Sequence, residues 1–146
     1  MKITSYRAED HDTLAEIWLR AVRATHHFIS EDDIAFYHRM VRDEYLTAVE
    51  VWEVLDDRHK PIGFIGLDGT KVEMLFVDPD HHGKGAGRQL LDHAKGLKGN
   101  ALSVDVNEQN EGALAFYQKY GFVQASRSEH DSAGRPYPIL HLRMNV

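Results

Sequence analysis

The hydrophobic periodicity of the chain changes after its first third, and this change most restricts the folds open to it. Apolar residues recur at helical spacing over 11–25 and again over 30–45. Alternating apolar runs then follow at 48–55, 62–67 and 71–77, separated by turn-forming residues. Because short turns join consecutive alternating runs, the sequence predicts two helices followed by an antiparallel meander of three strands.

The remaining segments complete a mixed fold. A short strand at 3–7 precedes the helices, with Asp10 as a helix N-cap, and the pattern Ser30-x-x-Asp33 predicts a capping box at the start of the second helix. After a glycine-rich segment, the periodicity predicts in turn a helix around 90–97, a strand at 102–106, a helix at 110–120, and strands at 122–129 and 138–144. The order β-α-α-β-β-β-α-β-α-β-β predicts one α+β domain over residues 1–146, with four helices and a mixed, mostly antiparallel sheet of about six to seven strands.

Composition excludes several classes of protein. The 146 residues carry a formal charge of −6 and no stretch that concentrates Lys and Arg among aromatics, so nucleic acid is not an expected partner. There is no cysteine, and the ten histidines show no metal-ligand spacing, so neither disulfides nor a metal site is expected. No window approaches the roughly 20 apolar residues of a membrane span, and no signal peptide is recognisable, so we expect a cytoplasmic protein with no membrane partner.

The segment FVDPDHHGKGAGRQLL, residues 76–91, places three glycines at alternate positions between a strand and a helix. It is not a P-loop, because Asp78 stands where the first glycine belongs and Gly85 follows Lys84. A dinucleotide-binding fingerprint requires Gly-x-Gly-x-x-Gly after the first strand of a βαβ unit, and this segment follows three antiparallel strands.

The glycines allow two interpretations. Alternating glycines let backbone N–H groups converge on an anion at the positive end of the next helix, and Lys84 and Arg88 add charge, so the ligand would carry phosphate or pyrophosphate. Alternatively, the segment is a tight strand-to-helix turn that binds nothing.

A second segment, VNEQNEGALAFYQKYGF at 106–122, distinguishes these alternatives. Together the two segments resemble the GCN5-related N-acetyltransferase (GNAT) family, in which the first cradles the pyrophosphate of acetyl-CoA and the second completes the cofactor site. The resemblance covers most of the chain and implies that fold. It implies a site for acetyl-CoA, as cosubstrate, formed by Leu75, Phe76, Val77, His82, Gly83, Lys84, Gly85, Ala86, Gly87, Arg88, Asn107, Asn110 and Phe116.

One position departs from the family pattern. Members usually have Arg or Gln at the first position of the loop, where this chain has His82, which implies a weaker or pH-dependent contact there. The segments RATHHF and GRPYP resemble those of the small bacterial members of the family.

The resemblance also implies a mechanism in which an amine attacks the thioester. A backbone N–H among residues 74–76, freed by a strand bulge, would donate to the oxyanion. Tyr117 would protonate the departing thiolate, and Glu73 would take the proton of the amine. The alternatives are that Tyr117 is a core tyrosine and that Glu73 is a solvent-facing strand residue.

The acceptor is the least determined part. In this family the acceptor groove lies opposite the cofactor, which implies His26, His27, Phe28 and Tyr137 as substrate residues. The acidic run at 31–33, with Asp43 and Glu44, favours either a cationic amine or simply a solvated helix face. The predicted function is acetyl transfer to a primary amine of a small molecule, peptide or protein; the alternative is a catalytically weak CoA-binding regulatory module. An exposed final strand would let a monomer pair into a homodimer.

Overall fold

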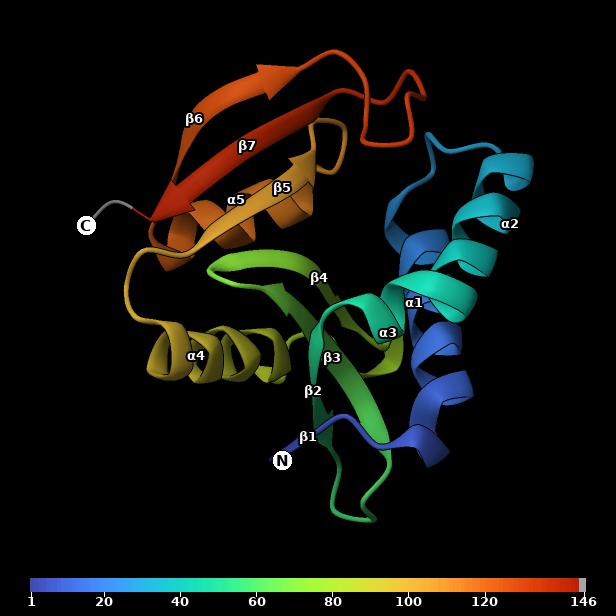
Figure 1. Cartoon of the computed structure of the whole chain (residues 1–146), viewed down its shortest axis with the longest axis vertical. Coiled ribbons are helices and arrows are strands. Elements are labelled where there is room, and N and C mark those ends of the chain that lie inside the picture. The colour runs from blue at the N-terminus through green and yellow to red at the C-terminus, as the bar shows by residue number, and fades with distance from the viewer. Residues whose placement is uncertain (145–146) are drawn as a thin grey trace.

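Seven strands form one mixed sheet in the computed structural model, which describes residues 1–144 (Figure 1). Their order is β1-β2-β3-β4-β5-β7-β6, and every neighbouring pair is antiparallel except β4 and β5. The strands are β1 (Lys2–Ser5), β2 (Glu50–Leu55), β3 (Pro61–Asp68), β4 (Lys71–Val77), β5 (Ser103–Asn107), β6 (Phe122–Ser128) and β7 (Ile139–Met144). The last strand, β7, lies between β5 and β6, so the exposed edge predicted for it belongs to β6 instead.

Helices cover both faces of this sheet (Figure 1). On one face, Leu14 and Ile34 of the first two helices pack with Phe64 of β3. On the other face, Leu90 and Tyr117 of the last two helices pack with the apolar side chains of β5. The helices are α1 (His11–Thr25), α2 (Glu31–Met40), α3 (Leu46–Ala48), α4 (Ala86–Lys98) and α5 (Glu111–Tyr120). The predicted α+β fold and element order are confirmed.

Several details of the elements differ from the sequence predictions. The Ser30 hydroxyl accepts the Asp33 N–H at 3.2 Å, which confirms the predicted cap, but α2 runs through a wider turn over 41–45 into α3, so β2 begins only at Glu50. Strand β1 ends at Ser5 rather than at residue 7. The Asp10 carboxylate does not cap α1, because it accepts the Arg7 Nε–H at 2.6 Å instead.

Strands β4 and β5 separate along their length, as Figure 1 shows. They pair only at Lys71–Ser103 and Val72–Val104. The pairing of β3 with β4 also shifts by one residue here, because Met74 lies opposite Gly66 and Val72 lies opposite Leu67, which leaves Glu73 as the extra residue of a bulge. The two irregularities together leave a gap in the middle of the sheet.

In the described part of the chain, no helix combines the length and the apolar composition that a membrane crossing requires.

Candidate functional site

The backbone of β4 presents hydrogen-bond donors to the gap. The Asp78 N–H donates to the Ile62 carbonyl of β3 at 2.8 Å. Because donors alternate between the two sides of a strand, the N–H groups of Leu75 and Val77 point away from β3 and toward the gap. The predicted range of donors was 74–76, and the alternation selects Leu75 within that range and adds Val77 beyond it.

A cavity of about 450 Å³ adjoins these donors and lies between β4, the glycine-rich loop and the start of α5. Most of the predicted cofactor residues line it: Leu75, Phe76, Val77, His82, Gly83, Gly85, Ala86, Gly87, Arg88, Asn110 and Phe116. Lys84 lines neither this cavity nor its smaller neighbour, and Asn107 lines the neighbour. The larger cavity is also lined by residues that were not predicted for it: Ala21, Thr25, His26, His81, Gly112, Ala113 and Tyr117.

The glycine-rich loop has the backbone conformation that an anion site requires. Gly83 and Gly85 have φ values of 79° and 84°, and a Cβ atom at either position would meet no atom within 4 Å. The first helical bond of α4 runs from the Gln89 N–H to the Gly85 carbonyl, so the N–H groups of Gly87 and Arg88 have no partner within the helix. These free donors and the unfilled space beside them fit a pyrophosphate.

Two side chains fix this loop to the rest of the fold. The Arg20 guanidinium of α1 donates to the Asp78 carboxylate at 2.9 Å, and the same carboxylate accepts the Asp80 N–H at 3.1 Å. His82 places Nε2 3.0 Å from the Val77 carbonyl oxygen. His82, the residue that departs from the family pattern, therefore contacts the end of β4 and also lines the larger cavity.

A smaller cavity of about 90 Å³ occupies the gap between β4 and β5. Glu73 and Leu75 line it from β4, Asp105 lines it from β5, and Tyr117 lines it from α5. Because Tyr117 lines both cavities, its side chain lies where the two meet.

Tyr117 is held firmly at this junction. Its ring lies edge-on to the rings of Phe116 and Phe122, with centroid distances of 5.4 and 5.5 Å, and only 7% of the residue is exposed. Burial raises the pKa of the Tyr117 phenol, so the hydroxyl keeps its proton at neutral pH. The side chain is thus both a core residue and a hydroxyl donor beside the cavities.

The sequence left open whether Glu73 is a proton acceptor or a solvent-facing strand residue, and its position is compatible with both. Its carboxylate is partly exposed to solvent, and Lys71 Nζ lies 3.4 Å from Oε1. The same side chain lines the smaller cavity together with Tyr117. A carboxylate in this position can accept a proton from a group that enters the cavity.

The structure brings three of the four predicted acceptor residues together, His26, Phe28 and Tyr137, but only His26 of the four lines a cavity. His26 lines both cavities, but His27 is exposed, and neither His27, Phe28 nor Tyr137 lines either cavity. The Phe28 ring packs between His26 and Tyr137, with centroid distances of 5.3 and 6.1 Å, and the Tyr137 hydroxyl donates to Asp33. Burial and the neighbouring charge of His27 lower the pKa of His26 to about 4, so this ring is neutral at physiological pH.

Comparison with known proteins agrees with this geometry. A family model described as an acetyltransferase (GNAT) domain matches residues 48–124. The peptidyl-lysine N-acetyltransferase YjaB of Escherichia coli is 41% identical over 142 residues, covering 97% of this chain and 95% of the relative. The solution structure of apo-form YjaB from Escherichia coli superposes with a TM-score of 0.92 and 40% identity, covering 99% of this chain and 97% of the other. The PaiA N-acetyltransferase of Thermoplasma acidophilum, solved in complex with coenzyme A, shares the fold, with a TM-score of 0.71, 23% identity and coverage of 97% and 98%.

The gap in the sheet beside the glycine-rich loop, with Tyr117 and Glu73 next to it, is suited to an acyltransferase. The comparisons identify the family of acyltransferase. The chain belongs to the GCN5-related N-acetyltransferase family and is an N-acetyltransferase. The predicted resemblance to the small bacterial YjaB-type members is confirmed.

Proposed function

We propose that the chain transfers the acetyl group of acetyl-CoA to the side-chain amine of a lysine in a peptide or protein. The observation that carries this proposal is the junction at Tyr117, where the larger, loop-bounded cavity meets the smaller cavity that contains the Glu73 carboxylate. Support for the acceptor class comes from the peptidyl-lysine acetyltransferase to which the chain is 41% identical.

The larger cavity has the parts needed to hold acetyl-CoA. The N–H groups of Gly87 and Arg88 would bind the pyrophosphate at the start of α4, beside the space left by Gly83 and Gly85. The N–H groups of Leu75 and Val77 would bind the amide groups and the thioester carbonyl along the gap. When bound, acetyl-CoA supplies the activated acetyl group.

Two side chains would move the protons. A lysine amine arrives mainly as an ammonium, with a pKa of about 10.4, and must lose a proton before it attacks. Glu73 is the carboxylate on β4 that lines the smaller cavity, so we assign to it the role of accepting the proton of the amine. Tyr117 keeps its proton at neutral pH and would donate it to the departing sulfur.

Ion pairs within the fold engage three carboxylates of the acidic segment at 31–44, so these three are unsuitable for acceptor recognition. Asp33 accepts the Arg135 Nε–H at 2.9 Å, and Glu31 lies 3.2 Å from Arg23. Asp43 is paired with Arg42 at 2.9 Å. We therefore place acceptor recognition at Glu73 and Asp105, because these two carboxylates line the smaller cavity together with Tyr117.

The deciding experiment incubates the protein with acetyl-CoA and lysine-containing peptides and records release of the CoA thiol, with mass spectrometry to locate the acetyl group. We expect a 42 Da addition on lysine, because the acetyl group replaces one amine hydrogen. Small diamines and aminoglycosides serve as competing acceptors, and a preference for them would reassign the acceptor class. Protection of the fold against heat by CoA without any thiol release would support the CoA-binding regulatory module instead.

The oligomeric state depends on a separate feature, the exposed edge of the sheet at β6. β6 lies at the edge of the sheet, beside β7 alone, and most of its residues are exposed. A second copy could pair along this edge, so the proposal includes either a monomer or a homodimer. Sedimentation with and without CoA distinguishes the two.

A further inference from the structure

A row of polar side chains crosses four adjacent strands of the sheet next to the smaller cavity. Lys71 Nζ of β4 lies 3.1 Å from Asp105 Oδ2 of β5. Asp105 Oδ1 lies 2.7 Å from His141 Nδ1 of β7, and His141 Nε2 lies 2.6 Å from the Ser128 hydroxyl of β6. The general acid and base assigned above leave Asp105, His141 and Ser128 without a function.

The hydrogen atoms in this row have one consistent arrangement when His141 is neutral. The Ser128 hydroxyl donates to His141 Nε2, and His141 Nδ1–H donates to Asp105 Oδ1. The Asp105 carboxylate is therefore held in one orientation by His141. Its second oxygen, Oδ2, is left facing the ammonium of Lys71.

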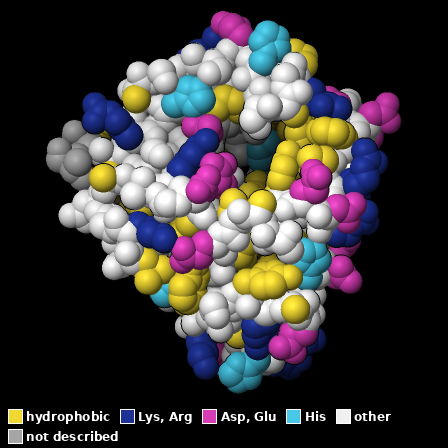
Figure 2. All heavy atoms as spheres, viewed as in Figure 1, with side chains coloured by type: hydrophobic (Ala, Val, Ile, Leu, Met, Phe, Trp, Pro, Cys, Tyr) yellow, Lys and Arg dark blue, Asp and Glu magenta, His cyan; other side chains and the backbone are white. Residues whose placement is uncertain are grey.

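This row lies on the face of the sheet that the last two helices leave uncovered. Val104 and Val106 of β5 are buried against the core of α4 and α5, so Asp105, between them, points to the opposite face. Figure 1 shows α5 behind β5, β6 and β7, with no helix in front of them. Figure 2 shows this face hollowed near its centre, with acidic and basic side chains beside the hollow.

The row meets the acetyl-transfer site at two carboxylates. Asp105 and Glu73 line the same small cavity from its two sides, together with Tyr117. An acceptor amine that reaches Glu73 must therefore pass close to Asp105. No other acidic side chain among the described residues lines this cavity.

An ammonium already lies between these two carboxylates. Lys71 Nζ is 3.1 Å from Asp105 and 3.4 Å from Glu73. Burial acts to lower the pKa of Lys71, but the hydrogen bond and charge of Asp105, with the charge of Glu73, raise it above its ordinary value. Lys71 therefore stays protonated and lacks the free electron pair of a nucleophile, but its charge and shape match those of an incoming lysine.

We propose that Asp105 is a specificity-determining residue that binds the ammonium of the acceptor through Oδ2, and that Lys71 occupies this position until a cationic acceptor displaces it. The proposal rests on the proposed function, because it concerns the acceptor of that reaction. His141 acts as a positioning residue that aims Asp105. The site selects alkyl amines, which are charged in water, over aromatic amines, which are not.

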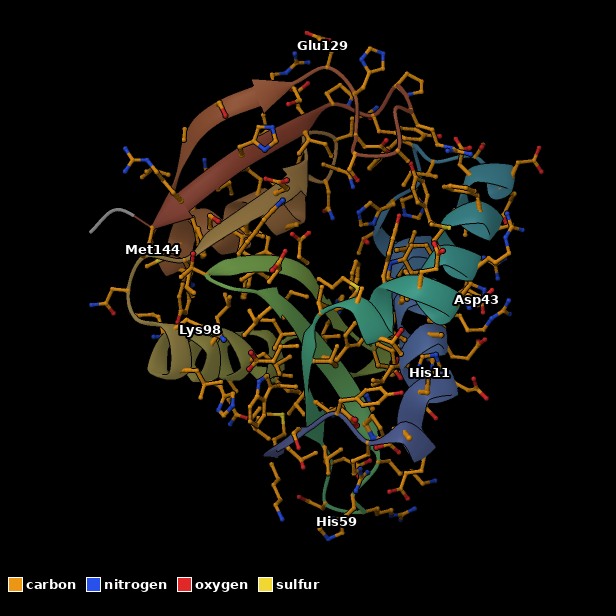
Figure 3. All side chains as sticks on the ribbon, in the orientation of Figure 1. His11, Asp43, His59, Lys98, Glu129 and Met144 are labelled. Carbon is orange, nitrogen blue, oxygen red and sulfur yellow. The ribbon has the colours of Figure 1, made fainter. Side chains whose placement is uncertain are left out.

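The test compares Asp105→Asn and Lys71→Met with the wild type. Asp105→Asn keeps the shape and removes the charge, so KM for a lysine peptide should rise by about 10-fold or more, while kcat and the KM of acetyl-CoA stay within about threefold. Lys71→Met removes the competing ammonium, so KM for the same peptide should fall several-fold. Asp57→Asn is the matched control, because this exposed carboxylate lines neither cavity and belongs to the β2–β3 turn, which Figure 3 marks at His59.

A direct titration of the lysine peptide into each CoA-loaded variant gives a second readout that needs no turnover. We expect weaker binding to Asp105→Asn, tighter binding to Lys71→Met, and unchanged binding to Asp57→Asn. Equal peptide affinity in wild type and folded Asp105→Asn overturns the assignment of Asp105. Weaker binding to Lys71→Met overturns the displacement by showing that Lys71 helps to hold the acceptor.

The outcomes also separate this inference from the proposed function. An active wild type whose peptide KM ignores both substitutions contradicts the inference alone. A wild type that transfers nothing to lysine peptides contradicts the proposed function, and the titration then still decides whether Asp105 binds an alkyl ammonium.

Discussion

His26 and Asn110 join the end of α1 to the start of α5, with Nε2 of the ring 3.3 Å from Nδ2 of the amide. The Asn110 oxygen also accepts the Ala113 N–H at 3.1 Å, so one side chain caps α5 and holds the histidine. The other ring nitrogen, Nδ1, lies 2.8 Å from the Thr25 hydroxyl. Because an amide nitrogen only donates, Nε2 must be the acceptor, and the ring makes this contact only while it is neutral.

The burial of the His26 ring makes stability depend on pH. The pKa of His26 is lowered from 6.5 to about 4 by burial and by the charge of His27, so folded protein binds this proton less tightly than unfolded protein. The stabilisation is complete above pH 6.5 and is lost as pH falls toward 4. Between these values the free energy of unfolding should decrease by up to about 3 kcal/mol on account of His26.

Urea unfolding of His26→Gln at several pH values checks this contribution. The variant cannot take up the proton, so its stability should decrease less than that of the wild type between pH 6.5 and 4. His130→Gln, at an exposed position in the β6–β7 loop, should keep the wild-type dependence. Parallel curves for wild type and His26→Gln would show that other groups cause the acid dependence.

The glycine at 87 offers a test of the cofactor loop. Gly87 lies in the first turn of α4, and a Cβ there would approach Phe116 Cζ to 3.3 Å, at the wall of the larger cavity. Gly87→Val should therefore weaken CoA binding by about 100-fold or more, because the side chain fills space needed for backbone contact with the pyrophosphate. Calorimetric titration of CoA measures the change.

A second glycine of α4 supplies the control for that variant. Gly96 lies in the same helix, and a Cβ there would meet no atom within 4 Å. Gly96→Val carries the same helix-propensity cost, so it should keep wild-type affinity for CoA. A folded Gly87→Val that binds CoA as tightly as Gly96→Val would refute the pyrophosphate assignment.

Local signals in the sequence predicted the order of elements, and the family resemblance carried by the two motifs implied most of the lining of the larger cavity. Period changes identify strands and helices, and the glycines at 83 and 85 mark backbone that other residues rarely adopt. The edge position of β6 was not predictable in this way. It depends on β7 pairing with both β5 and β6, a long-range arrangement that no local pattern encodes.

The acceptor side was harder to predict for the same reason. The family resemblance implied that both His26 and His27 bind the acceptor, yet the chain leaves α1 after Thr25 with the His26 ring buried and the His27 ring exposed. Asp105 gave no sequence signal beyond alternating with valines in a strand. The role that we propose for Asp105 depends on its contacts with Lys71 and His141, which lie on neighbouring strands of the sheet.

Glu73 can be tested by removing its basicity alone. Glu73→Gln keeps the size of the side chain, so kcat should fall by about 100-fold near neutral pH. The loss should shrink at high pH, where more of the acceptor amine is already neutral. Glu9→Gln is the control, because Glu9 is an exposed carboxylate that lines neither cavity, and it should leave the pH–rate profile unchanged. An equal loss at every pH would assign the proton transfer elsewhere.

Glu53 should give a pH dependence of opposite sign to that of His26. This side chain of β2 is fully buried, and its Oε2 accepts the Arg7 N–H at 2.7 Å. Burial, with the hydrogen bond and charge of Asp10, raises the pKa of Glu53 from 4.5 to about 7. The protonated form therefore contributes stability that is complete below pH 4.5 and is lost as pH rises through about 7.

A neutral replacement at position 53 measures that loss. Glu53→Gln cannot ionise, so it should become more stable relative to the wild type by about 3 kcal/mol as pH rises from 4.5 to 8. Chemical unfolding at both pH values gives the difference. If the variant and the wild type keep a constant difference across this range, Glu53 does not change its charge on unfolding.

Tyr117 is the residue on which the mechanism depends most. Tyr117→Phe removes one hydroxyl from a ring that Phe116 and Phe122 hold in place, so packing is retained. CoA affinity should stay within a few-fold, and turnover should fall by about 10- to 10⁴-fold, as expected for loss of a general acid. Tyr120→Phe is the matched control, because the Tyr120 hydroxyl donates to Asp92 at 2.6 Å and lies outside both cavities. A loss of CoA affinity with unchanged turnover of the bound complex would instead make Tyr117 a cofactor-binding residue, and a loss of stability alone would leave it a core tyrosine.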